Sequence, residues 1–227
     1  MDCALREAKQ TDVILAFGSL SYLKEIRQAY ETEMGKKRKR MKYTEKILEH
    51  PGFLCIQKEI TEWERERIYC HHEMSHAFDV CRMAWILYLE ICAENQWEEI
   101  RTEEINDRIY VTGLLHDIGR AAQYETGEHH TSAGKKIAEQ ILTEIDFPRE
   151  WKNDVLDTIT AHHGRNNRGS QKGGAGFLAE QITGLETAEL ITYCIQRADH
   201  LSRNCFCCEA AETCKWKEEE RNQTVVC

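Results

Sequence analysis

The sequence has little proline and no long apolar run, and each shortage excludes a class of structure. Only two prolines, Pro51 and Pro148, occur among 227 residues, so proline-rich linkers are excluded and long helices are permitted. The longest apolar run, Ala84–Ala93, is interrupted by Glu90 and is too short to span a bilayer. The N-terminal segment MDCALREAKQ has no apolar core of a secretory signal. We therefore expect a cytoplasmic protein with no membrane partner.

The composition is that of a folded, acidic protein with unusual numbers of two residue types. Hydrophobic residues make up 41% and charged residues 30%, which is typical of a globular domain. The net charge of −9 argues against non-specific binding to nucleic acid. Eleven cysteines and ten histidines stand out. Because thiols stay reduced in the cytoplasm, clustered cysteines indicate metal binding rather than disulfides.

The residue pattern divides the chain into three segments. Residues 1–40 are predicted to be an N-terminal extension, residues 41–204 the main domain and residues 205–227 a cysteine-rich tail. In the main domain apolar residues recur at helical spacing, and no alternating run of convincing length predicts a strand. We therefore predict an all-α domain. Its expected helices cover residues 64–94, 105–116, 131–145, 151–162 and 185–202, and a glycine-rich loop covers residues 164–176.

Histidines occur in adjacent pairs more often than chance predicts. Ten histidines spread over this chain should give about 0.4 such pairs. The chain has three instead: His71–His72, His129–His130 and His162–His163. This excess favours a shared role for several histidines.

A histidine and an aspartate stand together where a predicted apolar helix ends. His116 and Asp117 follow Leu114 and Leu115 and precede Gly119 in the segment LLHDIG. A helix end of this kind lets the polar pair point into a cavity while the leucines anchor the core. Imidazole and carboxylate together suit zinc, manganese or iron. Two adjacent ligands need further ligands from elsewhere in the chain.

His76 and Asp199 are the candidates for these further ligands. His76 lies beside the apolar stripe of the predicted helix 64–94, and Asp199 has a similar place on the predicted helix 185–202. Either residue alone is more simply explained as an ordinary polar partner on a helix. The prediction therefore depends on the ordered set of residues.

This order of residues resembles the HD-domain superfamily of metal-dependent phosphohydrolases. The matching segments are HAFDVCRMA at His76, LLHDIGR at His116 and Asp117, and RADHLSR at Asp199. With the helices between them they span roughly residues 64–204. The resemblance implies a helical bundle with a metal site in its core, held by these four residues. It also implies hydrolysis of a phosphoester by metal-activated water.

Further histidines resemble those of dinuclear members of the superfamily. HHTSAG points to His130, and TAHHG points to His162 or His163. The resemblance then implies two divalent ions (Fe, Mn, Zn, Co or Ni) bridged by Asp117. Bacterial diadenosine tetraphosphate hydrolases and HD-GYP cyclic-dinucleotide phosphodiesterases carry histidines in these places. GRNNRGSQKGG follows here instead of a GYP motif, which disfavours the second group. Three roles are open for His72: a metal ligand, a partner of a metal ligand, or an exposed neighbour.

Cationic side chains near the predicted site are candidates for contacts with phosphate. Arg120 follows the HD pair by three residues, and Arg203 lies one turn after Asp199. Some mononuclear relatives carry an acid at the position of Arg120, whereas other HD proteins carry a Lys or Arg there. We therefore interpret Arg120 as a phosphate clamp rather than a general acid, and Arg203 as a second clamp. His129 is a candidate proton donor to the leaving group or an exposed neighbour of His130. Three cations on the glycine-rich loop either close over a polyphosphate or belong to an ordinary surface connection.

Four cysteines gather at the end of the predicted domain. They are Cys205, Cys207, Cys208 and Cys214, in the segment CFCCEAAETC. Either all four bind one ion, or Cys205, Cys208 and Cys214 bind it with a ligand from outside the segment. Thiolates suit structural zinc, and an iron–sulfur cluster is also chemically compatible. The alternative is a reduced, cysteine-rich helix end without metal.

Three functions follow from these patterns. The first is a phosphohydrolase for a nucleotide or another small phosphoester. The second is a noncatalytic nucleotide-sensing or partner-binding module that keeps the metal site as a scaffold. The third is a di-iron oxygenase on the same fold. Substrate recognition and oligomeric state have no readable signal in the sequence.

Overall fold

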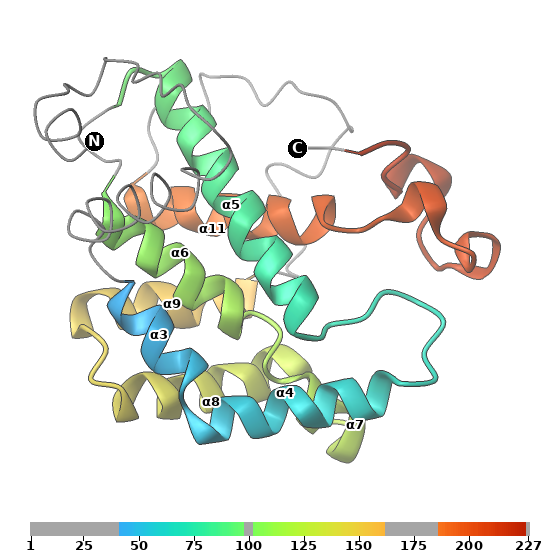
Figure 1. Ribbon diagram of the computed structural model, residues 1–227, viewed down its shortest axis with the longest axis horizontal. Coiled ribbons are helices and arrows are strands. Elements are labelled where there is room, and N and C mark those ends of the chain that lie inside the picture. Colours follow the sequence, from blue (N-terminus) through green and yellow to red (C-terminus); the bar gives the residue numbers. More distant parts are fainter. Residues whose placement is uncertain (1–40, 98–101, 162–185, 226–227) are drawn as a thin grey trace, which may run out of the picture. The chain divides into compact units, whose positions relative to one another are not determined.

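The computed structural model describes residues 41–97, 102–161 and 186–225 and confirms the predicted all-α class. In these ranges every regular element is a helix, and no strand occurs (Figure 1). The α-helices are α3 (Lys42–Leu48), α4 (Pro51–Glu64), α5 (Met74–Glu94), α6 (Glu103–Leu115), α7 (Arg120–Thr126), α8 (His130–Glu144), α9 (Arg149–Ala161) and α11 (Thr187–Leu201). The short 3-10 turns η2 (Cys205–Cys207), η3 (Ala211–Thr213) and η4 (Glu218–Glu220) follow. None of the described helices has the length and apolar character needed to cross a bilayer.

The predicted helix 64–94 is wrong over its first third. The helix α4 ends at Glu64, and α5 begins only at Met74. Ile68, which the helical pattern places on the apolar stripe, is exposed in the connecting segment. The buried carboxylate of Glu64 accepts a hydrogen bond from the backbone N–H of His72 at 2.5 Å. This contact folds the connection back on the end of α4, and a continuous helix would prevent it.

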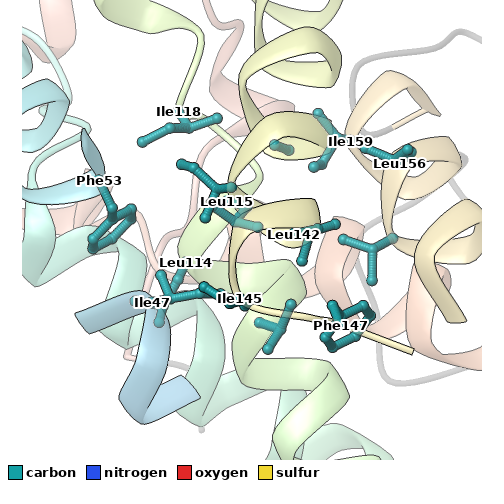
Figure 2. Packing of buried hydrophobic residues seen from close by; sticks show 14 of the residues in the cluster. Ile47, Phe53, Leu114, Leu115, Ile118, Leu142, Ile145, Phe147, Leu156 and Ile159 are labelled. Atoms are coloured by element: carbon teal, nitrogen blue, oxygen red, sulfur yellow. The ribbon is translucent and has the colours of Figure 1, made fainter. Parts of the chain in front are cut away.

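Helix α6 lies at the centre of the described unit and belongs to two hydrophobic clusters. Ile105 and Ile109 pack with residues of α5 and α11. Leu114 and Leu115 pack instead with α3, α4, α8 and α9, as Figure 2 shows for the labelled side chains. A helix buried on two sides carries its C-terminal end into the interior. The residues that follow it, His116 and Asp117, are therefore buried as well.

Local sequence features explain where α6 begins and how closely its neighbours approach. Thr102 caps the helix by accepting a hydrogen bond from the backbone N–H of Ile105 at 3.2 Å. The buried Asp107 carboxylate accepts the backbone N–H groups of Tyr43 and Thr44 at 2.9 and 2.8 Å, which holds the start of α3 against α6. Asp107 is thereby satisfied structurally and is not part of the candidate site.

A glycine permits the contact between α5 and α6. A Cβ atom at Gly113 would lie 2.6 Å from the sulfur of Cys81 on α5. Only a residue without a side chain lets the two helices approach this closely at that point. Because His76 lies on α5 and the HD pair follows α6, this packing sets the distance between them.

Candidate metal centre

Four of the predicted ligands lie together in the structure, although they come from three helices. His76 is in the first turn of α5, His116 and Asp117 follow α6, and Asp199 is near the end of α11. One ligand atom from each of the four lies within 4.8 Å of the others. Among the described residues, no other group of three or more histidine, cysteine, aspartate or glutamate residues meets this criterion.

The distances within the group define two close pairs. His76 Nε2 lies 3.4 Å from Asp199 Oδ1, and His116 Nε2 lies 3.3 Å from Asp117 Oδ2. The Nδ1 atom of His116 lies 2.7 Å from the carbonyl oxygen of Gly113. A carbonyl only accepts, so Nδ1 carries the proton and Nε2 presents its lone pair to the group. This tautomer is the one that a metal-binding imidazole requires.

Neighbouring charges shift the pKa values of two of these side chains. Burial alone would raise the pKa of Asp199, but the guanidinium of Arg203 and the hydrogen bond with His76 hold it well below its usual range. Burial would lower the pKa of His116, but the carboxylate of Asp117 outweighs burial and raises it. Ionised carboxylates beside imidazoles at this depth form a donor set that suits a divalent cation.

Both predicted phosphate clamps pair with a carboxylate of the group. Arg120 Nε donates to Asp117 Oδ1 at 2.9 Å, and an Nη atom of Arg203 donates to Asp199 Oδ2 at 3.2 Å. Both side chains are largely buried. Each arginine therefore fixes the orientation of one carboxylate and adds positive charge to the edge of the site.

The predicted second set of histidines is only partly described. His130 is buried at the start of α8, with Nε2 3.9 Å from Asp117 Oδ1. It stands beside Asp117 rather than among the four. His129 caps α8 by accepting the backbone N–H of Thr131 at 3.4 Å, a structural task that its sequence neighbours do not signal. His162 and His163 lie outside the described residues, as does the glycine-rich loop 164–176.

No sequence pattern pointed to Glu64 and Tyr124, which are hydrogen-bonded to each other beside His72. Glu64, 1% exposed, accepts hydrogen bonds from His72 Nδ1 at 2.5 Å and from the Tyr124 hydroxyl. The other ring nitrogen of His72 lies 3.9 Å from Asp117 Oδ2. His72 therefore lies between the buried carboxylate, to which it is hydrogen-bonded, and Asp117. Residues 60 positions apart meet here, so no local pattern could reveal the contact.

We expect Glu64→Gln to destabilise the protein by about 3 kcal/mol at pH 7. Burial would raise the pKa of Glu64, but the hydrogen bonds and charge of His72 lower it to about 2. Because the folded-state pKa lies below the unfolded-state value of about 4.3, the stabilisation is present above that pH and is lost as the pH falls. The difference in free energy of unfolding between wild type and variant should fall to about half of its pH 7 value by pH 3.

Urea unfolding at pH 7 and pH 3 measures this difference. The matched control is Glu62→Gln on the same helix, because Glu62 is exposed and pairs with the exposed Arg65. The control should unfold like the wild type at both pH values. A Glu64→Gln variant as stable as wild type at pH 7 would contradict the assignment.

The comparison with protein families agrees with this geometry. Residues 76–204, more than half of the chain, match the family model described as HD domain. The protein therefore belongs to the HD-domain family, whose members are generally metal-dependent hydrolases. The matched region begins at His76 and includes the other three residues of the group.

Two proteins are similar to this chain in sequence. An uncharacterized protein of Clostridium beijerinckii is 27% identical over 176 residues, which cover 78% of this chain and 93% of that protein. Ribonuclease Y of Acetivibrio thermocellus is 27% identical over 96 residues, which cover 42% of this chain but 15% of the ribonuclease. The match to the second protein therefore concerns only a small part of it. No solved structure matches the chain.

Proposed function

We propose that this protein hydrolyses a phosphoester of a nucleotide or another small molecule with the help of divalent metal. The observation that carries the proposal is the buried group of His76, His116, Asp117 and Asp199, whose ligand atoms lie within 4.8 Å of one another. Such a group in the core of an HD domain suits metal binding, because two imidazoles and two carboxylates place their ligand atoms around one small volume.

The donor set decides which cofactors fit. Two imidazoles and two carboxylates accept Fe, Mn, Zn, Co or Ni, whereas an all-thiolate set would favour softer ions. We propose two such ions, with His130 and His162 or His163 contributing to the second and Asp117 shared. Bound metal lowers the pKa of water towards neutrality and polarises a phosphoryl oxygen.

The remaining side chains of the site bind and orient. Arg120 and Arg203 place positive charge beside Asp117 and Asp199, where the negative charge of a phosphoester would otherwise be repelled. The pairing also keeps the two carboxylates turned towards the histidines. His72, held by Glu64, restricts the position of Asp117 from the other side.

A panel of phosphoesters tests the proposal. Metal-free protein is reloaded anaerobically with Mn²⁺ or Fe²⁺ and given nucleoside mono-, di- and triphosphates, dinucleoside polyphosphates and p-nitrophenyl mono- and diesters. The similarity to ribonuclease Y supports including the diesters and short RNA. We expect metal-dependent product release from at least one class, and none from the metal-free protein.

The other outcomes of the same panel separate the alternatives. Nucleotide binding without turnover under every metal condition would contradict hydrolysis and favour a sensing module. Oxygen consumption by the iron-loaded protein, with no phosphate or alcohol released, would favour the di-iron oxygenase.

A further inference from the structure

We infer that Cys70, Cys205, Cys208 and Cys214 form a separate structural zinc site. The inference selects one of the two ligand sets that the sequence left open and supplies its missing fourth ligand. Its residues are different from those of the candidate hydrolytic site. It therefore does not depend on the proposed function.

The four cysteines lie around one cavity, although Cys70 is far from the others in the sequence. They line a cavity of about 380 Å³ between the segment that precedes α5 and the segment that follows α11. The Tyr69 hydroxyl donates to the backbone carbonyl of Thr213 at 3.3 Å. This bond joins the neighbours of Cys70 and Cys214. Figure 1 shows the connection from α4 to α5 and the C-terminal tail on the same side of the described unit.

The backbone of the tail favours a zinc-binding turn. The backbone N–H of Cys208 donates to the carbonyl of Cys205 at 3.2 Å, which closes the turn η2 around the CxxC segment. The spacing C-x2-C is typical of structural zinc sites. Cys214 directly follows η3 and begins an extended stretch.

Cys207 borders the same cavity, but its greater exposure excludes it from the proposed ligand set. It is exposed, whereas Cys70, Cys205, Cys208 and Cys214 are each partly buried. Its sulfur lies 3.5 Å from the carbonyl oxygen of Asn204. The neighbouring residue in the turn therefore belongs to the protein surface, and Cys70 takes the fourth place.

The shared cavity places the other three thiols near Cys70, and their charges affect its pKa. Burial raises the pKa of this thiol, the charge of Arg203 lowers it, and Cys205, Cys208 and Cys214 each raise it. All four are free, with no disulfide among them.

Binding requires the sulfurs to lie closer together than they do in the described structure. No three of the sulfurs lie within a mutual 4.8 Å in the described structure. Zinc–sulfur bonds of about 2.3 Å in a tetrahedron place sulfurs about 3.8 Å apart. The cysteines lie on short turns and a connecting segment rather than within helices, so these can close on an ion without repacking the core.

The site would brace the candidate hydrolytic centre from outside. Cys70 precedes His76 by six residues, and Cys205 follows Asp199 by six residues. Between them, the Arg203 guanidinium stacks on Trp216 at 4.4 Å and reaches Asp199. The Asn222 side chain also donates to the carbonyls of His200 and Arg203 at 2.9 and 2.8 Å. The tail is thus already attached to α11, and zinc would tie it to the start of α5.

Metal analysis of full-length protein in an Asp117→Asn background tests the inference without interference from the hydrolytic centre. We expect one zinc per chain, resistant to dialysis. Adding Cys70→Ser should reduce it by at least tenfold, and Cys208→Ser should do the same. Cys207→Ser is the matched control and should keep the full equivalent. Full zinc retention by Cys70→Ser would overturn the assignment, as would zinc loss by Cys207→Ser.

A spectroscopic measurement on protein without cysteine substitutions guards against variants that do not fold. Cobalt added to the metal-free protein should produce the visible bands of tetrahedral thiolate coordination, and one equivalent of zinc should abolish them. The absence of thiolate bands would overturn the inference. An iron–sulfur chromophore in freshly purified protein would overturn the choice of zinc. Loss of phosphohydrolysis alone would bear only on the proposed function.

Discussion

Replacing Asp117 with asparagine should remove both bound metal and hydrolysis from the histidine site. The Asp117 carboxylate lies 3.3 Å from His116, 3.9 Å from His72 and His130, and 2.9 Å from Arg120, so every part of the site converges on it. The amide keeps the shape but removes the negative charge that a cation needs. Residues that only orient metal ligands cost 10–100-fold when removed, so we expect a loss of at least about 100-fold in turnover.

The measurement combines metal content, turnover on the best substrate of the panel, and circular dichroism. The matched control is Asp157→Asn, because the Asp157 carboxylate is exposed on α9 and pairs with the exposed Lys135 at 3.4 Å. The control should keep wild-type metal content and rate. A folded Asp117→Asn protein that retains its metal and its activity would contradict both the site and the proposed function.

Substituting Gly119 with alanine should be the most destabilising single change in the segment LLHDIG. A Cβ atom at this position would lie 2.0 Å from the carbonyl oxygen of His130 and 2.4 Å from the backbone nitrogen of Gly134. Both contacts are with the backbone of α8, which cannot rotate away as a side chain can. We expect the free energy of unfolding to fall by about 4 kcal/mol or more, a loss typical of disrupted cores and strained backbones.

Gly127→Ala is the matched control for this substitution. Gly127 ends α7 with φ of 78°, and nothing lies within 4 Å of its added Cβ atom. Alanine there meets only the intrinsic strain of the left-handed conformation, about 1–2 kcal/mol. Thermal or urea unfolding of both variants measures the difference. Equal stability losses would contradict the close approach of Gly119 to α8.

The close contact between Gly119 and the backbone of α8 also affects the metal site. Gly119 follows Asp117 by two residues, and the carbonyl it touches belongs to His130. The turn between α6 and α7 therefore packs directly against the start of α8. The distance between Asp117 and His130 depends on this contact between backbones, which explains why a glycine is needed two residues after Asp117.

Helix type and the order of candidate ligands could be predicted from the sequence because both are local properties. The apolar spacing of α6, α9 and α11 follows the helical period, and their observed bounds lie within two residues of the predicted ones. His76, the HD pair and Asp199 were recognised from short segments with their apolar flanks. The same local reasoning made an error before α5. The spacing of Ile68 fits a helix, but the contact between Glu64 and His72 opposes one.

By itself the sequence determined the helical class, the family resemblance and four residues that meet in the core. Each of these is encoded within a segment of about ten residues, where periodicity and neighbours suffice. Tertiary structure alone decided that Glu64 and Tyr124 support His72, that Gly119 rests on α8, and that Cys70 joins the C-terminal cysteines. These contacts join segments far apart in the chain. Their partners are selected by the packing of helices against a shared core, which leaves no periodic trace in the sequence.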